Sequence, residues 1–460
     1  MSEIAPRPRA PSARAAAGKP SRSAAAAATA TDTPAARKQR RAAAPQSAPR
    51  QSPDRADPAT PSLSPTRDAA RKPRAATPLP APLPRERAEQ LARALAPWFL
   101  AHQRDLEWRH TRDPYAIWVS EVMLQQTRVD TVKSYWAPFM RRFPDLATLA
   151  AADEQQVLAA WSGLGYYRRA RLLHAGARHV HTTLAGRMPV RPEQLREIPG
   201  IGRYTAGAIA SIAHDQPAAL VDGNVARVLS RLQAIQEPKQ QAADAPGHWS
   251  LAQQIVESGS PRVLAQALME LGATVCTPQQ PRCQACPVRP LCLAHAQGVV
   301  DQIPAPRQRA ASPQQDLWAV GLRKAGRLLL TRRPAAGLLA GMWCLPLIDR
   351  PPAPPEAPHG GLFDRSKLTP AALRSALGVR VHKIDPPHEP IKHVFTHRIW
   401  MLWPLRADLD LADGNDLRSP GNPGPLATLA PDETAWILPG ERPVGGIPTV
   451  TQRLLERLGY

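Results

Sequence analysis

The 460-residue sequence is poor in cysteine, in acidic residues and in long apolar runs. Five cysteines are too few for a disulfide-dense secreted scaffold. No apolar run approaches the roughly 18 residues of a transmembrane helix, so we expect neither a membrane span nor a secretory signal. Lys and Arg number 59 against 38 Asp and Glu, and the formal net charge is +21. This excess favours a polyanionic partner, nucleic acid above all, over a surface that is merely soluble.

Residues 1–84 contain no Phe, Tyr, Trp or Val and hold a large share of the positive charge. A segment with so little apolar surface cannot offset the entropy lost on ordering, and its prolines interrupt any long amphipathic helix. We therefore predict a disordered, basic tail rich in Ala and Pro. An organellar transit peptide is the alternative, because the segment is rich in Arg, Ala and Ser and poor in acidic residues.

The rest of the chain divides into two regions of different pattern. Residues 85–300 repeat apolar side chains at helical intervals, with short loops of Pro, Gly or Asp between the repeats, and predict an all-α domain. Residues 301–315 are polar and contain Pro, as a linker does. Residues 316–460 combine short apolar runs around a glycine turn with two helical stretches. The predicted fold class is thus multidomain, with a smaller α+β domain following the helical one.

Four of the five cysteines lie close together, with the spacing C-x6-C-x2-C-x5-C: Cys276, Cys283, Cys286 and Cys292. Disulfides are not expected, because cytosolic thiols stay reduced. Zinc usually takes two separated C-x2-4-C pairs, whereas an iron–sulfur cluster takes four thiolates. The spacing therefore favours a cluster and leaves zinc open. Cys344 lies apart from the group, and we expect it to be a small buried hydrophobe.

The stretch "LREIPGIGRYTAGAIAS" predicts a helix, a tight turn at residues 199–202 and a second helix. Gly200 and Gly202 let the backbone bend and approach a ligand closely. The N–H groups at the start of the second helix suit a phosphate oxygen. A turn of this kind occurs in many helical proteins, and the small residues of "TAGAI" strengthen the interpretation.

These motifs, in this order, resemble the endonuclease III and MutY family of DNA glycosylases, and the resemblance covers residues 85–455. It implies a helix-hairpin-helix body in which the four clustered cysteines ligate a [4Fe–4S] cluster. It also implies that Gly200 and Gly202 belong to a clamp on the DNA backbone. Arg282 and Arg289, between the cysteines, are placed to meet phosphate or to remain solvated surface charges.

Two carboxylates carry the chemistry that the resemblance implies. "LVDGNVARV" is similar to a family motif, and this similarity implies that Asp222 stabilises the sugar cation. It also implies that Asn224 helps to position Asp222 or the sugar. Without the motif, Asp222 would be interpreted as a helix N-cap. "SEVMLQQT" is similar to the adenine-excising branch and implies that Glu121 protonates the adenine. The apolar neighbours of Glu121 predict a raised pKa, which suits a general acid, although a glutamate on a helix surface is the simpler interpretation.

Tyr204 decides between two kinds of glycosylase. Bifunctional relatives carry a lysine two residues after the second glycine of the hairpin, and its amine forms a Schiff base with the sugar. This sequence has Tyr204 there. The resemblance therefore implies a monofunctional enzyme without strand cleavage.

Further segments resemble parts of the family that handle the DNA duplex. "WSGLGYYRRARLLH" implies that Leu164 and Tyr166 act as a wedge, with Gln126 filling the gap left by a flipped base. "RDLEWRHTRDPYAIW" resembles the mouth of the adenine pocket, although Glu107 stands where the family often has proline. The residues expected at these places, besides the wedge, are Arg168, Arg169 and Arg171 near the DNA backbone, Trp108 stacked on adenine, and Arg104 and Arg109 contacting adenine or phosphate.

The region from residue 316 resembles the Nudix (MutT-like) domain appended to MutY proteins. "TPAALRSALGVRV" lacks the glutamates with which a Nudix hydrolase holds magnesium, so recognition is expected here and hydrolysis is not. "HVFTHRIW" resembles the loop that inspects 8-oxoguanine. Phe395, Thr396 and His397 fill its three places, with Thr where the family has Ser.

Together these resemblances imply a monomeric adenine glycosylase acting on double-stranded DNA with adenine opposite 8-oxoguanine or guanine. We expect a cytoplasmic bacterial protein that associates with the nucleoid through DNA. One alternative is an endonuclease III-like glycosylase and lyase that removes oxidised pyrimidines. The other is a non-catalytic iron–sulfur protein that only binds DNA.

Overall fold

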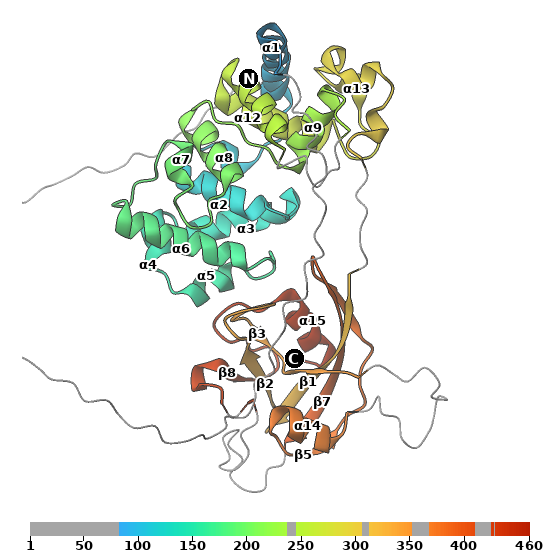
Figure 1. Ribbon diagram of the computed structural model, residues 1–460. Coiled ribbons are helices and arrows are strands. Elements are labelled where there is room, and N and C mark those ends of the chain that lie inside the picture. Colours follow the sequence, from blue (N-terminus) through green and yellow to red (C-terminus); the bar gives the residue numbers. More distant parts are fainter. Residues whose placement is uncertain (1–81, 237–244, 306–311, 352–367, 410–424, 427) are drawn as a thin grey trace, which may run out of the picture. The chain divides into compact units, whose positions relative to one another are not determined.

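The computed structural model describes residues 82–236, 245–305, 312–351, 368–409, 425–426 and 428–460. The predicted disordered tail lies almost entirely outside these residues, and so does the centre of the predicted linker. Within the described residues, a helical region is followed by a region built on a β-sheet, as the sequence predicts (Figure 1). No helix in the described part is long and apolar enough to span a membrane.

The first helices show how the sequence pattern sets the local structure. α1 (Arg85–His102) buries one face, formed by residues such as Leu91, Leu95 and Phe99. α2 (Pro114–Leu124) begins at the N-cap Asp113, whose carboxylate accepts from the next backbone N–H groups, and it is buried on nearly all sides. The helical pattern of the sequence continues through residues 115–143, whereas the structure has an interruption at residues 125–128 before α3 (Val129–Arg142) begins.

The middle of the helical region contains the predicted hairpin. The elements here are η1 (Glu107–Arg109), α4 (Leu146–Ala151), α5 (Glu154–Ala160), α6 (Arg168–Thr183), α7 (Pro192–Leu195), α8 (Arg203–His214) and α9 (Gly223–Leu232). α7 and α8 are the two helices of the hairpin, and α8 packs against α2. This packing brings the start of α8 to the helix that carries Glu121.

The last helices of this region close the core and lead to the cysteines. α11 (Pro246–Glu257) is followed by α12 (Pro261–Thr274), which packs against α1, α8 and α9. The cysteine loop then runs through η2 (Cys283–Ala285), η3 (Arg289–Leu291), α13 (Leu293–Ala296) and η4 (Val300–Gln302). α12 therefore connects the interior of the helical region to the cysteine loop.

The second region is a mixed β-sheet with the path order β3-β2-β1-β7-β5. Its strands are β1 (Gln314–Lys324), β2 (Arg327–Arg332), β3 (Trp343–Cys344), β4 (Leu347–Asp349), β5 (Val381–Ile384), β6 (Ile391–Val394), β7 (Ile399–Leu409) and β8 (Thr434–Ile437). The hairpin predicted around Gly326 is β1–β2. The stretch "HVFTHRIWMLWPL", whose pattern also predicts a strand pair, lies in β6 and β7. β1 and β7 run parallel, and the other pairs are antiparallel.

Both faces of the sheet are covered, because successive side chains of a strand point to opposite faces. On one face, Leu317 and Ala319 pack with Leu454 of α15 (Thr449–Arg457). On the other, Trp318 and Val320 pack with Leu373 of α14 (Pro370–Leu377). The short η5 (Pro431–Glu433) precedes β8. The two predicted helices of this region thus complete a layered α+β domain.

Candidate active site

A cavity of about 490 Å³ lies in the helical region, and most of the predicted catalytic residues line it. Its walls come from the segment before α2, from α2 itself, and from the starts of α8 and α9 and the middle of α12. The predicted residues among the lining are Arg104, Trp108, Arg109, Glu121, Gln126, Tyr204, Asp222 and Asn224. Segments more than 100 residues apart in the sequence therefore meet at one site.

Glu121 is buried in this wall, with 5% of its surface exposed. Burial raises its pKa to about 7, and the negative charge of Asp222 adds to the rise, whereas a hydrogen bond from Tyr204 opposes it. At neutral pH a substantial fraction of Glu121 therefore carries its proton. A carboxylic acid of this kind can donate a proton to a bound base.

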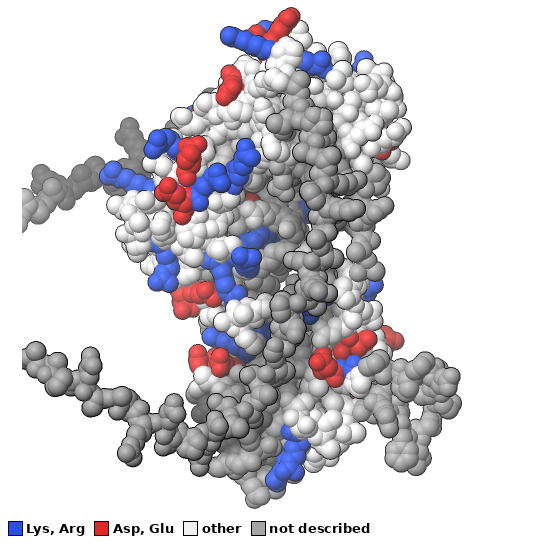
Figure 2. Space-filling model, in the orientation of Figure 1, with Lys and Arg blue, Asp and Glu red and all other residues white. Residues whose placement is uncertain are grey.

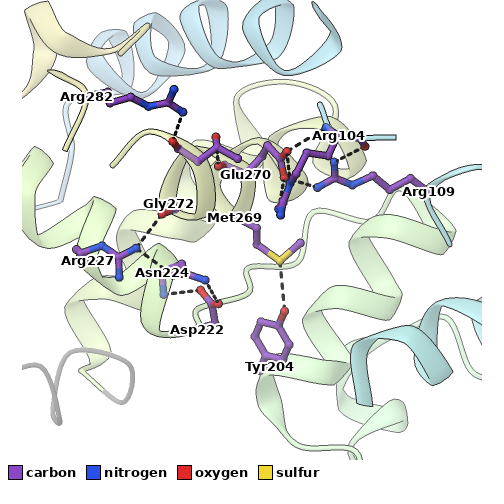
Figure 3. A network of polar contacts seen from close by, with 11 residues as sticks. Arg104, Arg109, Tyr204, Asp222, Asn224, Arg227, Met269, Glu270, Gly272 and Arg282 are labelled. Carbon is purple, nitrogen blue, oxygen red and sulfur yellow. Dashed lines mark hydrogen bonds and ion pairs between the residues drawn. The ribbon is translucent and has the colours of Figure 1, made fainter. Parts of the chain in front are cut away.

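Tyr204 lies in the first turn of α8 and faces Glu121. Its hydroxyl donates a hydrogen bond to Oε2 of Glu121 at 2.7 Å. Sδ of Met269 lies 3.3 Å from the same hydroxyl (Figure 3). Burial and the nearby carboxylates raise the pKa of Tyr204 well above its ordinary value. Tyr204 therefore stays a neutral hydrogen-bond donor. The cavity presents no amine at this position.

Asp222 caps the N-terminus of α9 and lines the cavity at the same time. Its carboxylate accepts hydrogen bonds from the backbone N–H groups of Asn224 at 2.9 Å and Val225 at 2.7 Å. The side-chain amide of Asn224 donates a third bond at 3.1 Å. Burial raises the pKa of Asp222, and these three bonds counteract the rise. The N-cap interpretation and the catalytic one are therefore compatible, because the cap holds the carboxylate at the cavity.

Arg227 links this carboxylate to the cysteine loop. Its guanidinium donates to the side-chain oxygen of Asn224 at 2.9 Å and to the carbonyl of Gly272 at 2.8 Å (Figure 3). It also donates to the carbonyl of Cys276 at 2.8 Å. A Cβ added to Gly272 would lie 2.8 Å from the Cβ of Asn224. The end of α12 is thus packed tightly against the start of α9, which fixes the position of Asn224.

Glu270 is a cavity residue that the sequence analysis missed. Its side chain is fully buried and forms ion pairs with Arg104 at 2.8 Å and Arg109 at 2.6 Å (Figure 3). Burial would raise its pKa, but the hydrogen bonds from the two guanidinium groups lower it to about 2. Arg104 and Arg109, predicted to contact adenine or phosphate, are therefore held by a protein carboxylate. The signal available in the sequence was an unexplained Glu in the otherwise apolar segment "LAQALMELGA".

Trp108 and Gln126 lie at the cavity in different environments. Trp108 is 6% exposed and packs edge-on against Trp136, with 6.1 Å between the ring centres. Little of the Trp108 ring is therefore exposed for stacking on a base in this conformation. Gln126 follows α2 in the interruption before α3, with a left-handed φ of 57°.

The hairpin turn needs its first glycine more than its second. Gly200 has a φ of 84°, and an added Cβ would lie 2.8 Å from the Cβ of Leu172. Gly202 is the N-cap of α8, with a φ of −85° that any residue adopts, and a Cβ there would meet nothing within 4 Å. Of the two roles predicted for these glycines, the bend therefore depends on Gly200, whereas at Gly202 the missing side chain leaves room for close approach of a ligand.

The loop before α6 exposes one of the two predicted wedge residues. Tyr166 is 46% exposed and has a left-handed φ of 48°, whereas Leu164 is only 5% exposed. Leu164 is thus not available at the surface in this conformation. Arg168 is exposed, but Arg169, predicted to lie near the DNA backbone, is buried beneath the loop.

The four clustered cysteines line one small cavity, which Arg231 also borders. Nη1 of Arg231 lies 3.3 Å from Sγ of Cys276. Four sulfur donors in one cavity fit the ligand set of an iron–sulfur cluster. Among the described residues, no group of three or more His, Cys, Asp or Glu side chains is arranged to hold a single metal ion. Cys344 is buried in the sheet domain, as expected.

Comparison with known proteins assigns the helical region to a family. Residues 119–246 match the family model of the HhH-GPD superfamily base excision DNA repair protein. The adenine DNA glycosylase of Buchnera aphidicola subsp. Baizongia pistaciae is 31% identical over 249 residues, which cover 54% of this chain and 70% of that protein. The chain belongs to the adenine DNA glycosylase family.

Mammalian members of the adenine DNA glycosylase family are more similar over a smaller share of their length. The protein of Rattus norvegicus is 40% identical over 313 residues, covering 57% of this chain and 61% of its own. The protein of Homo sapiens is 41% identical over 314 residues, covering 56% of this chain and 58% of its own. The chain therefore spans about three fifths of these relatives.

The sheet region of this family member matches the NUDIX domain model over residues 317–457. At the turn between β6 and β7, Phe395 packs edge-on against Trp400 and His393, with ring centres 4.8 and 4.6 Å apart. Thr396 and His397 are exposed. The turn thus anchors one residue of the predicted triplet and presents the other two to solvent.

Charge on the visible face is grouped rather than uniform. Figure 2 shows several clusters of Lys and Arg with Asp and Glu beside them. The Lys and Arg side chains coloured in this view do not form one continuous basic surface. The contacts of individual residues, and not the overall charge, therefore indicate where nucleic acid would bind.

Proposed function

We propose that this chain is a monofunctional adenine DNA glycosylase that removes adenine paired with 8-oxoguanine or guanine. The observation that carries the proposal is a buried Glu121 with a pKa of about 7 in the same cavity as Asp222. Excision of a base needs an acid for the leaving group and an anion for the sugar cation. The relatives named adenine DNA glycosylase support the adenine-excising part of this proposal.

Glu121 acts as the general acid in this proposal. The acid must be protonated before reaction, and the apolar burial of α2 keeps it so near neutral pH. The hydrogen bond from Tyr204 fixes the orientation of the carboxyl while leaving its other oxygen, Oε1, to face the base. Protonation of a ring nitrogen of adenine makes the base a better leaving group.

Asp222 stabilises the positive charge that develops on the sugar as the N-glycosidic bond breaks. Its three hydrogen bonds favour the ionised form and so oppose the effect of burial on its pKa, and Asn224 and Arg227 hold it in place. A preorganised charge of this kind costs no reorganisation in the transition state. Water then completes the hydrolysis.

Strand cleavage is not part of the proposed reaction, because Tyr204 stands where a lyase carries its amine. The hydroxyl of Tyr204 is committed to Glu121 and stays protonated. It cannot form the Schiff base through which bifunctional glycosylases cut the strand. The endonuclease III-like alternative therefore has no nucleophile at this position.

The hairpin and the loop of Tyr166 are proposed to handle the duplex. Uncapped N–H groups at the start of α8 suit a phosphate oxygen, and no side chain at Gly202 obstructs it. Tyr166 and Gln126 would enter the space left by the flipped adenine. Leu164 could take part only after the loop rearranges, since it is buried here.

Cys276, Cys283, Cys286 and Cys292 are proposed to hold a [4Fe–4S] cluster. Such a cluster would act as a structural clamp for the loop, away from the reacting atoms. Cys276 is the residue whose carbonyl Arg227 contacts, so the loop is connected to the residues that hold Asp222.

Recognition of 8-oxoguanine is assigned to the turn of Phe395, Thr396 and His397. Phe395 is held by Trp400, which leaves the polar side chains of Thr396 and His397 at the surface. Neither a hydrolytic role nor a magnesium site is proposed for this domain, because α14 contains no glutamate.

The proposal is tested by incubating the full-length protein with a duplex that contains one adenine opposite 8-oxoguanine. We expect release of adenine, with strand breaks only after treatment with hot alkali. Breaks without alkali would favour the lyase alternative, and no abasic sites would favour a protein that only binds DNA. A duplex with an adenine–thymine pair is the control and should remain intact.

A further inference from the structure

Arg169 is an unusual buried cation just below the surface loop that carries Tyr166. It is 9% exposed, and no carboxylate contacts its guanidinium in the described parts of the chain. Burial lowers its pKa to about 10, so it remains charged at neutral pH. A buried charge without an ionic partner costs folding free energy unless its hydrogen bonds are satisfied. The groups that accept hydrogen bonds from Arg169 therefore indicate its role.

One side of the guanidinium binds the C-terminal end of α2. Nη1 donates to the carbonyls of Val122 at 2.7 Å and Met123 at 2.9 Å, and also to that of Gln125. These carbonyls have no partner within the helix, because the last turn lacks following N–H groups. A cation is favourable here, at the negative end of the helix dipole. Arg169 thereby terminates the helix that carries Glu121.

The other side binds the loop before α6. Nη2 donates to the carbonyls of Leu164 at 3.3 Å and Gly165 at 3.2 Å. It also donates to the hydroxyl of Thr127, in the segment after α2, at 3.0 Å. The guanidinium carbon also lies 5.4 Å from the ring centre of Trp161 and 5.5 Å from that of Tyr166. One side chain thus joins two loops that are about 40 residues apart in the sequence.

The bonded carbonyls stand next to two strained residues. Gln125 directly precedes Gln126, whose φ is 57°, and Gly165 directly precedes Tyr166, whose φ is 48°. A left-handed φ is unfavourable for residues other than glycine and persists only where the surroundings impose it. Arg169 supplies such a constraint at both places with a single rigid group.

The geometry points to Arg169 as a positioning residue that holds Gln126 and Tyr166 together, ready to enter the duplex, and ties both to the helix of Glu121. This inference rests on the proposed function, in which these two side chains fill the gap left by the flipped adenine. Opening of the duplex and placement of the acid are then coupled through one guanidinium. Arg169 itself touches neither the base nor the sugar.

The test compares Arg169→Met and Arg169→Lys with Val180→Ala in the full-length protein. Methionine keeps the apolar length of the side chain and removes every donor. Lysine keeps the charge, but its single ammonium cannot bridge both loops. Val180 is buried near the far end of α6, so Val180→Ala weakens the same helix without touching either loop. Thermal unfolding shows the temperature range in which all variants are folded.

Two readouts separate positioning from mere stability. The first is the single-turnover rate of adenine excision opposite 8-oxoguanine. The second is the fluorescence of a 2-aminopurine beside a stable abasic analogue, which rises when a side chain opens the stack. We expect Arg169→Met and Arg169→Lys to lower the rate by about 10²-fold and to abolish most of the fluorescence rise. Val180→Ala should retain both signals.

The outcomes that overturn the inference differ from those that overturn the proposed function. Full activity of folded Arg169→Met, or complete rescue by Arg169→Lys, would contradict the two-sided bridge. Glu121→Gln should excise roughly 10²–10⁴-fold more slowly yet still raise the fluorescence, which separates opening of the duplex from chemistry. If the unaltered protein opens the duplex but releases no adenine, the proposed function fails while the fluorescence still tests Arg169. No fluorescence rise with the unaltered protein would overturn the inference.

Discussion

Glu121 and Glu270 line the same cavity, yet the protein treats their carboxyl groups in opposite ways. Glu121 lies among apolar residues of α2 with one hydrogen bond from a neutral tyrosine, and its pKa is about 7. Glu270 is also buried, but it forms ion pairs with Arg104 and Arg109, and its pKa is about 2. Burial is common to both, so the partner decides the protonation state.

The difference shows how one small cavity keeps an acid and an anion a short distance apart. A neutral hydrogen-bond donor orients a carboxyl without forcing it to ionise, whereas two guanidinium groups do force it. Residues whose environments drive their pKa values apart are the usual sign of divided acid and base roles. Glu121 is therefore the candidate acid, and Glu270 holds the arginines of the opposite wall.

The largest expected effect comes from Glu121→Gln. Glutamine fits the site and can still accept the hydrogen bond from Tyr204, but it has no proton to give. We expect the single-turnover excision rate to fall by roughly 10²–10⁴-fold, with DNA affinity retained in a gel-shift assay. Excision at the normal rate would show that another group is the acid. Glu270→Gln is the matched variant, and it should still excise adenine where it is folded.

The same two substitutions should change stability in opposite directions at pH 8. Glu270→Gln leaves two arginines without their buried anion and should cost about 3 kcal/mol. In the unfolded chain the carboxyl of Glu121 ionises above its ordinary pKa of 4.5, whereas in the folded protein it ionises only above about pH 7. Glu121→Gln removes this carboxyl. That group lowers stability as pH rises through this window, so its removal should stabilise by about 2–3 kcal/mol.

Denaturant unfolding at pH 5 and pH 8 measures both changes. The gain from Glu121→Gln should shrink at pH 5, because the destabilisation by this carboxyl accumulates between its unfolded and folded pKa values and pH 5 lies near the lower end of that window. Glu257→Gln, an exposed substitution on α11, is the control and should stay within about 0.5 kcal/mol of the unaltered protein. Changes of the same sign for Glu121 and Glu270 would contradict the comparison.

A smaller effect is expected on the pH dependence of excision. Glu121 must be protonated to act, so the rate should fall about tenfold per pH unit above roughly pH 7. The hydrogen bond from Tyr204 lowers the pKa of Glu121, so Tyr204→Phe should move this descending limb to higher pH. If the descending limb of the pH–rate profile stays in place or moves to lower pH, the hydrogen bond from Tyr204 does not lower the pKa of Glu121.

The smallest effect is expected at the contact between α8 and α12, which line the cavity on the sides of Tyr204 and Glu270. Met269 precedes Glu270, and its sulfur lies 3.3 Å from the hydroxyl of Tyr204. Thioether sulfur is a weak acceptor, and Met269→Leu preserves volume, so stability should change by less than about 1.5 kcal/mol. The pH profile of excision should be nearly unchanged. A large shift of that profile would mean that the walls are electrostatically coupled through Met269.

The sequence predicts the acid of this comparison but not its counterpart. The resemblance of "SEVMLQQT" to the adenine-excising branch indicates Glu121, and its apolar neighbours in the chain predict its raised pKa. The pairing of Glu270 with Arg104 joins residues 166 positions apart, and no local pattern indicates it. Arg104 and Arg109 were accordingly predicted to face the ligand alone.

Backbone conformation explains the other differences. The order of helices, the two strand pairs and the cysteine group follow from periodicity and spacing. The interruption after α2, the burial of Leu164 and the burial of Arg169 depend on the left-handed turns at Gln126 and Tyr166, which non-glycine residues rarely adopt. Only tertiary contacts reveal such turns.

The most direct test of the central claim is infrared spectroscopy of the carboxyl groups at pH 6. A protonated carboxyl has a C=O stretching band that is distinct from the carboxylate bands. Difference spectra between the unaltered protein and each glutamine variant identify the group. The account predicts that Glu121→Gln removes a protonated-carboxyl band and that Glu270→Gln removes only carboxylate bands. A protonated band that disappears with Glu270→Gln and survives Glu121→Gln would contradict it.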